Sequence, residues 1–81
     1  MEDFVKRMIT ERDELKERID KLEDFMSKVK NGDVTVSEPE LELLESQLEY
    51  MKKYYIVLDT RIGFHILTTI SNEKETEDES I

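Results

Sequence analysis

The sequence predicts an all-α fold, an antiparallel and coiled-coil-like helical hairpin that assembles into a homo-oligomeric helical bundle. Three observations predict it. Two long segments place apolar residues three and four positions apart, which is the spacing of one helix face. A short connection at residues 31–36 separates the two segments and carries signals that stop one helix and start the next. The second segment also holds more apolar residues than a single partner helix covers, which favours self-association.

The first helix is expected from residue 3 to about residue 30. Its apolar seam is interrupted only by Arg12, and alternating charges fill the remaining positions, as on a solvated helix face. Asn31 and Gly32 end the helix, because glycine tolerates the left-handed backbone conformation that helix ends often need. The seam consists of Met1, Val5, Met8, Leu15, Ile19, Leu22, Met26 and Val29.

The second helix is expected from residue 38 to about residue 70. Ser37 is its N-cap, because the hydroxyl can accept a hydrogen bond from the amide of Glu40. Pro39 fits the first turn, where a missing amide proton costs little. The seam consists of Leu41, Leu44, Leu48, Met51, Tyr55, Leu58, Ile62, His65 and Thr69.

Antiparallel folding about the connection pairs residues whose numbers sum to about 70. This register brings the two seams together along the whole hairpin and gives both a heptad repeat. It places Arg12 opposite Leu58 and Val5 opposite His65. The polar exceptions in the seam therefore lie toward the open end, away from the connection.

The second helix carries another set of apolar residues, which one partner helix cannot cover. Four of them repeat every seven residues and are called the outer stripe: Leu43, Tyr50, Val57 and Phe64. Leaving four or five such side chains in water would forgo about 1.5–3 kcal/mol each. We therefore expect a subunit interface, with the candidate residues Leu43, Tyr50, Ile56, Val57, Gly63, Phe64, Leu67 and Ile70.

Other interpretations exist for the end of the second helix. The stretch from Ile62 to Ile70 is rich in β-branched and aromatic residues, which is typical of a β-strand. A helix kinked near Gly63 is an intermediate interpretation. Residues 71–81 carry five acidic residues, one lysine and a single apolar residue, so a disordered acidic tail is expected there.

The composition excludes several classes of function. The net charge of −9 argues against direct nucleic-acid binding, because phosphate contacts need clustered basic residues. The chain has no cysteine and a single histidine, so no disulfide, thiolate metal site or cofactor is expected. No segment is long and apolar enough to span a membrane, and an acidic N-terminus is unlike a signal peptide. A cytoplasmic protein is expected.

Catalytic patterns are absent from the sequence. Paired glutamates lie on outward helix faces without a histidine three residues on, so the di-iron helix-bundle pattern is missing. The serines lie at a cap, beside a loop, on a charged face or in the tail, far from His65 in the expected hairpin. We therefore expect a protein that binds and is not an enzyme.

Three groups of residues resemble a known family. The chain is similar to small two-helix phage proteins related to a crAss-like-phage protein, over residues 4 to 62. The resemblance implies a non-enzymatic phage accessory protein acting in the cytoplasm of the infected host cell, and it supplies no catalytic residues. Its matching positions are Phe4, Arg7 and Met8, then Leu15, Lys16, Arg18, Ile19, Lys21, Leu22 and Phe25, then Gln47, Leu48, Met51, Tyr54 or Tyr55, Leu58, Arg61 and Ile62.

Arg12 is the sharpest candidate for a ligand contact. An arginine in an apolar seam needs a carboxylate or a ligand phosphate, because burying an unpaired charge is costly. A structural alternative is an ion pair with Asp59, one residue beyond the position opposite Arg12. An arginine used across a subunit interface is a third interpretation.

The remaining candidates for a ligand site cluster toward the open end. Arg7 and Arg61 can bind an anion, and the rings of Tyr54 and Tyr55 can stack on a base, although aromatic residues at helical spacing more often serve packing. His65 can sense pH or contact an anion, although a lone seam histidine is more often a hydrogen-bonded structural residue.

Two functions follow as hypotheses. In the first, the homo-oligomer antagonises host defence by binding and sequestering an anionic nucleotide-type signal. In the second, the hairpin is a protein–protein interaction module that binds and inhibits a host defence or regulatory protein. Small helical phage proteins favour both by analogy of fold class alone.

Overall fold

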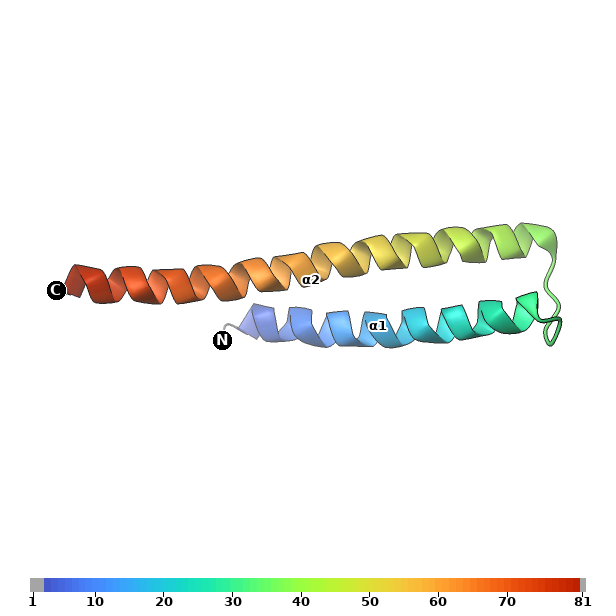
Figure 1. The fold of residues 1–81 in the computed structure, drawn as a ribbon, viewed down its shortest axis with the longest axis horizontal. Coiled ribbons are helices and arrows are strands. Elements are labelled where there is room, and N and C mark those ends of the chain that lie inside the picture. The colour runs from blue at the N-terminus through green and yellow to red at the C-terminus, as the bar shows by residue number, and fades with distance from the viewer. Residues whose placement is uncertain (1–2, 81) are drawn as a thin grey trace.

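The computed structural model describes the backbone of residues 3–80 and the side chains of residues 3–68. This part of the chain forms two helices, α1 (Asp3–Lys30) and α2 (Glu38–Ser80), and contains no strand. The helices run antiparallel as an elongated hairpin of 67 × 17 × 15 Å, with α2 continuing past the start of α1 (Figure 1). The predicted all-α hairpin is confirmed.

The connection ends α1 through its backbone. Gly32 has a φ of 85°, the left-handed conformation that a side chain would disfavour. The amide of Asp33 then donates a hydrogen bond of 2.9 Å to the carbonyl of Lys28, and the amide of Gly32 donates one of 3.1 Å to Val29. These bonds satisfy carbonyls that the end of the helix would leave unpaired.

The start of α2 has the expected cap. The amide of Glu40 donates to the hydroxyl of Ser37 at 3.3 Å, and the amide of Leu41 donates to the carbonyl of Ser37 at 2.9 Å. The first bond occupies an amide that lacks a partner within the helix, and the second is the first backbone hydrogen bond of the helix itself.

The buried core lies toward the open end of the hairpin. Leu58 is fully buried, and it forms a cluster with Met8 and Ile62, against which Ile9 and Ile66 pack. These contacts follow the expected register, in which paired numbers sum to about 70. The six buried apolar residues are Val5, Met8, Leu15, Ile19, Leu58 and Ile62.

Packing is looser toward the connection. Seam residues such as Met26, Val29, Leu41 and Leu48 are only half-buried, and the two ribbons diverge toward this end (Figure 1). The apolar seam therefore extends to the connection in the sequence, but only its part near the open end of the hairpin is fully buried.

The end of α2 differs from the strand interpretation. Residues 62–70 are helical, and α2 passes through Gly63 as one element (Figure 1). The helix reaches Ser80, beyond the end expected near residue 70, because no glycine or proline follows Gly63 to stop it. Residue 81 and the side chains of residues 69–80 lie outside the described part, so the disordered tail stays a prediction.

Candidate ligand-binding site

Arg12 has a protein partner. Its Nη1 donates to Oδ1 of Asp59 at 2.9 Å, and its Nη2 lies 3.2 Å from Oδ1 of Asp13. The hydrogen bond to Asp59 raises the pKa of the Arg12 guanidinium, and the neighbouring Asp13 acts in the same direction. This geometry matches the structural alternative, in which the arginine joins α1 to α2.

Replacing Arg12 with methionine is expected to change the free energy of unfolding by less than about 1 kcal/mol, because partly exposed ion pairs contribute little. The side chains of Arg12 and Asp59 are 26% and 52% exposed, so Asp59 can be hydrated once its partner is gone. Urea denaturation of Arg12→Met beside Asp59→Asn measures the effect. A loss above about 2 kcal/mol would show that the pair holds the helices together.

Tyr54 joins the helices on one side of the hairpin. Its hydroxyl donates a hydrogen bond to Oε1 of Glu11. This bond raises the pKa of the phenol, partial desolvation and the charge of Glu11 raise it further, and the charge of Arg61 acts in the opposite direction. Arg61 therefore lies within electrostatic reach of Tyr54.

Glu11→Gln is expected to lower the titration midpoint of Tyr54. The folded protein holds the phenol proton more tightly than the unfolded chain, whose ordinary tyrosine pKa is 10.0. The contribution to stability is therefore complete below that value and is lost as pH rises through the raised pKa. Ultraviolet absorbance of tyrosinate against pH measures the shift, with Tyr54→Phe identifying the titrating group. Identical curves for the wild type and Glu11→Gln would contradict this assignment.

Arg61 and Arg7 are the candidate basic residues without an ion pair in the described part of the chain. Both are exposed, and neither forms an ion pair with another residue whose side chain the structure describes. Arg61 lies seven residues after Tyr54 and so shares its side of α2. Arg7 lies one helical turn before Glu11 on α1. We call this side of the hairpin, defined by Arg7, Glu11, Tyr54 and Arg61, the tyrosine flank.

His65 is held by aromatic packing. Its ring meets the ring of Phe4 edge to face at 5.0 Å between centroids, and that of Phe64 at 5.6 Å. The side chain is half-buried at the open end of the hairpin. Its contacts favour the structural interpretation of this histidine.

Tyr55 lies apart from Tyr54. It is half-buried in the seam and lines a groove together with Lys16, Ile19 and Ile56. The Lys52–Glu23 ion pair of 3.1 Å also lies on this side and joins α2 to α1. Tyr55 and Tyr54 therefore cannot both belong to one compact site on the tyrosine flank.

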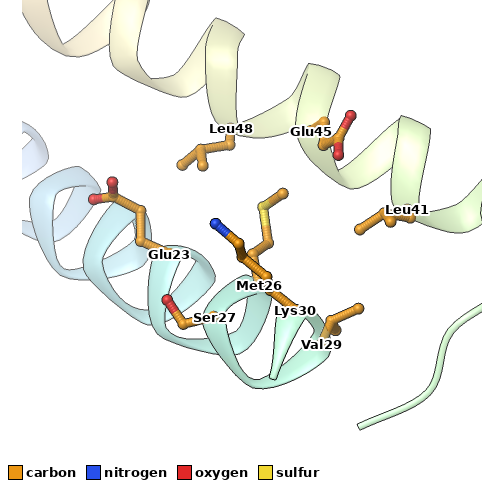
Figure 2. Close-up of a pocket in the computed structure, with 8 residues that line it drawn as sticks. All are labelled: Glu23, Met26, Ser27, Val29, Lys30, Leu41, Glu45 and Leu48. Carbon is orange, nitrogen blue, oxygen red and sulfur yellow. The ribbon is translucent and has the colours of Figure 1, made fainter. Parts of the chain in front are cut away.

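The groove continues toward the connection, where it has a volume of about 420 Å³. Figure 2 shows Met26, Val29, Leu41 and Leu48 turned toward the space between the helices. Its charged lining residues are Glu23, Lys30 and Glu45. Because the acidic residues outnumber the basic one, this groove does not suit an anion.

The outer stripe is exposed. The exposed fractions are 66% for Leu43, 67% for Tyr50, 55% for Val57 and 63% for Phe64. Ile56 and Leu67 are exposed as well, whereas the side chain of Ile70 lies outside the described residues. A Cβ atom added at Gly63 would meet nothing within 4 Å, so the hairpin itself does not need this glycine.

Neither a cluster of metal ligands nor a membrane-crossing helix is found among the described residues. No three of their histidine, aspartate and glutamate side chains are grouped as metal ligands. Within the same part of the chain, neither helix has an apolar stretch of the length that a membrane crossing needs.

Glu11 and Phe4 were not among the candidates from the sequence. A spacing of seven residues places them on one side of α1, where they meet Tyr54 and His65 of α2. Comparing the flanks of the two helices, and not only their seams, could have found them.

A family model described as Sequestin matches residues 2–64. The matched stretch contains all of α1, the connection and α2 as far as residue 64, and so includes every residue of the tyrosine flank. It covers nearly the same residues as the resemblance to small phage proteins. No curated protein and no solved structure matches the chain.

Proposed function

The chain belongs to the Sequestin family, and from this membership and the tyrosine flank we propose that it sequesters an anionic nucleotide-type signal as a homo-oligomer. It binds this ligand without reacting with it and thereby antagonises host defence from the cytoplasm of the infected host cell. The family name itself denotes sequestering.

The observation that carries the proposal is that Arg61 and Tyr54 lie on the same flank of the hairpin. Arg61 is exposed and holds no carboxylate among the described side chains, so its guanidinium is available to a phosphate. Tyr54, two helical turns earlier on the same side, offers an aromatic ring 43% exposed, a surface on which a base can stack. A guanidinium and an aromatic ring on the same flank suit a ligand with both a phosphate and a base.

The stretch of α2 around Tyr54 and Arg61 differs in charge from the rest of the chain. The chain carries 21 acidic and 12 basic residues, yet from Tyr50 to Ile70 the basic residues are Lys52, Lys53 and Arg61 against the single acid Asp59. This stretch of α2 therefore carries a net positive charge, which favours an anion, whereas residues 38–49 hold five glutamates and no base.

The test is to purify the protein from cells that make nucleotide signals and to heat-denature it. Stoichiometric release of an unchanged nucleotide, identified by mass spectrometry, is the expected result. Calorimetry with cyclic and linear nucleotides then gives the affinity. Absence of binding across the panel, or release of a hydrolysed product, would contradict sequestering.

A second function is favoured by the exposed outer stripe, which can receive a helix of a host protein. In that case a pull-down from host lysate recovers a defence or regulatory protein in stoichiometric amount. Recovery of the protein with a nucleotide and no other chain supports sequestering instead.

A further inference from the structure

Four exposed apolar residues lie in a straight row on α2. The outer stripe repeats every seven residues, and its side chains are between 55% and 67% exposed. Val57 adjoins Leu58 of the buried core in sequence but lies about 100° away around the helix. The hairpin therefore has a second apolar face that α1 cannot reach.

We propose that this face pairs with the same face of a second copy, antiparallel and with paired residue numbers summing to about 107, and that a nucleoside phosphate binds across the resulting two-fold axis. This site deepens the proposed sequestering function and rests on it. The second copy contributes residues to this site, which is incomplete without it.

The spacing of the stripe selects the register. When the sum is 107, Leu43 meets Phe64 of the second copy and Tyr50 meets its Val57, so all four stripe residues are covered. A shift of seven residues one way sets Leu43 against Ser71, and a shift the other way sets Phe64 against Val36 in the connection. Either shift leaves a large apolar side chain in water at each end.

Charge selects the antiparallel direction. The first part of α2, residues 38–49, holds five glutamates and no base. Parallel pairing would lay this segment against its own copy. Antiparallel pairing lays it against residues 58–69 of the second copy, which hold Arg61 and one acid. The acidic ends at residues 71–81 are then also at opposite ends of the dimer.

The same pairing brings two tyrosine flanks together. Tyr54 and Arg61 lie three residues before and four residues after Val57, so they border the stripe on the same side. A two-fold axis sets like flanks side by side. Tyr54 therefore faces Tyr54 of the second copy near the axis, and Arg61 faces Gln47 of the second copy.

The chemistry of this surface fits a nucleoside phosphate. The two Tyr54 rings offer stacking surfaces for a base, and each Arg61 offers a forked donor for a phosphate. Gln47 of the second copy adds an amide that can donate or accept. In a single hairpin, Arg61 and Tyr54 would face water on the side that the second copy closes.

Cysteine cross-linking tests the pairing without any ligand, because the chain has no cysteine of its own. Lys53→Cys is expected to cross-link to itself through a bismaleimide of about 10 Å, the spacing of packed helices. Leu43→Cys is expected not to, since its two copies lie about 32 Å apart along the axis. An equal mixture of Leu43→Cys and Phe64→Cys is expected to cross-link. Self-linking of Leu43→Cys, or no linking at all, overturns the pairing.

Val57→Glu with Ile56→Glu as a matched control tests the site. Both positions hold exposed β-branched residues. Ile56 is among the interface candidates from the sequence, but it lies outside the outer stripe, about 100° from Val57 on the groove side, so the proposed pairing does not cover it. Val57→Glu is expected to give monomers at micromolar concentration and nucleotide binding at least about tenfold weaker, whereas Ile56→Glu keeps both properties. Circular dichroism confirms that each variant folds.

The results of these experiments distinguish failure of the shared site from failure of the proposed sequestering function. Equal behaviour of the two variants overturns the shared site, and if the wild type still binds a nucleotide, sequestering stands. The expected cross-links without any nucleotide binding overturn the shared site and the sequestering function together. Light scattering and calorimetry on the full chain give both readouts.

Discussion

Leu58→Ala is expected to lower the free energy of unfolding by about 2–5 kcal/mol, the usual cost of removing a fully buried leucine side chain. Leu58 is 0% exposed, and it packs with Met8 and Ile62 where the two helices approach closely. Folded domains are stable by only about 5–15 kcal/mol, so this one change removes a large part of the total. Urea denaturation at fixed protein concentration measures it.

Leu67→Ala is the matched control for this loss. It makes the same chemical change on the same helix, at a side chain that is 66% exposed. Leu67 is among the interface candidates from the sequence but lies outside the outer stripe, so its cost is expected to stay within about 0.5 kcal/mol, as for surface substitutions. Equal losses from the two variants would contradict a core centred on Leu58.

Arg61→Glu is expected to weaken nucleotide binding by about 10- to 150-fold, because a hydrogen bond to a charged group contributes about 1.5–3 kcal/mol. The variant should fold as the wild type does, since Arg61 is exposed and pairs with no described carboxylate. Calorimetry at two salt concentrations measures the affinity. Arg61→Lys keeps the charge but loses the forked donor, so its nucleotide affinity is expected to lie between those of the wild type and Arg61→Glu.

Lys6→Glu controls for long-range charge. It reverses one charge near the same end of the hairpin, on the opposite side of α1 from Glu11. Because screening weakens distant charges in salt, its effect is expected to be a few-fold at most. A loss as large as that of Arg61→Glu would show that net charge alone governs binding.

Much of the fold follows from local patterns in the sequence. The three-and-four spacing of apolar residues predicts both helices, and Ser37 and Gly32 predict the cap and the turn that the structure shows. These features depend on residues a few positions apart, so the sequence contains them directly. The end of the second helix does not follow from local patterns in this way. The sequence has no glycine or proline after Gly63 to stop the helix, and the β-branched residues between Ile62 and Ile70 also fit a strand.

The sequence predicts only part of the candidate ligand-binding site. Arg61 and Tyr54 are found as candidates, but so are Arg12, which pairs with Asp59, and Tyr55, which lines the other side of the hairpin. Residue type alone cannot separate a charge held by a neighbour from one that is available. Pairing across the helices makes that distinction.

The sequence by itself determined two helices, their boundary at the connection and the seam that joins them, because helical periodicity is a local property. Only the tertiary structure decided which side chains meet across the hairpin. The paired numbers total 65 for Tyr54 with Glu11, 71 for Arg12 with Asp59 and 75 for Lys52 with Glu23. The stagger between the two flanks depends on how the helices cross and how side chains slant toward each N-terminus, and neither is encoded in a single seam.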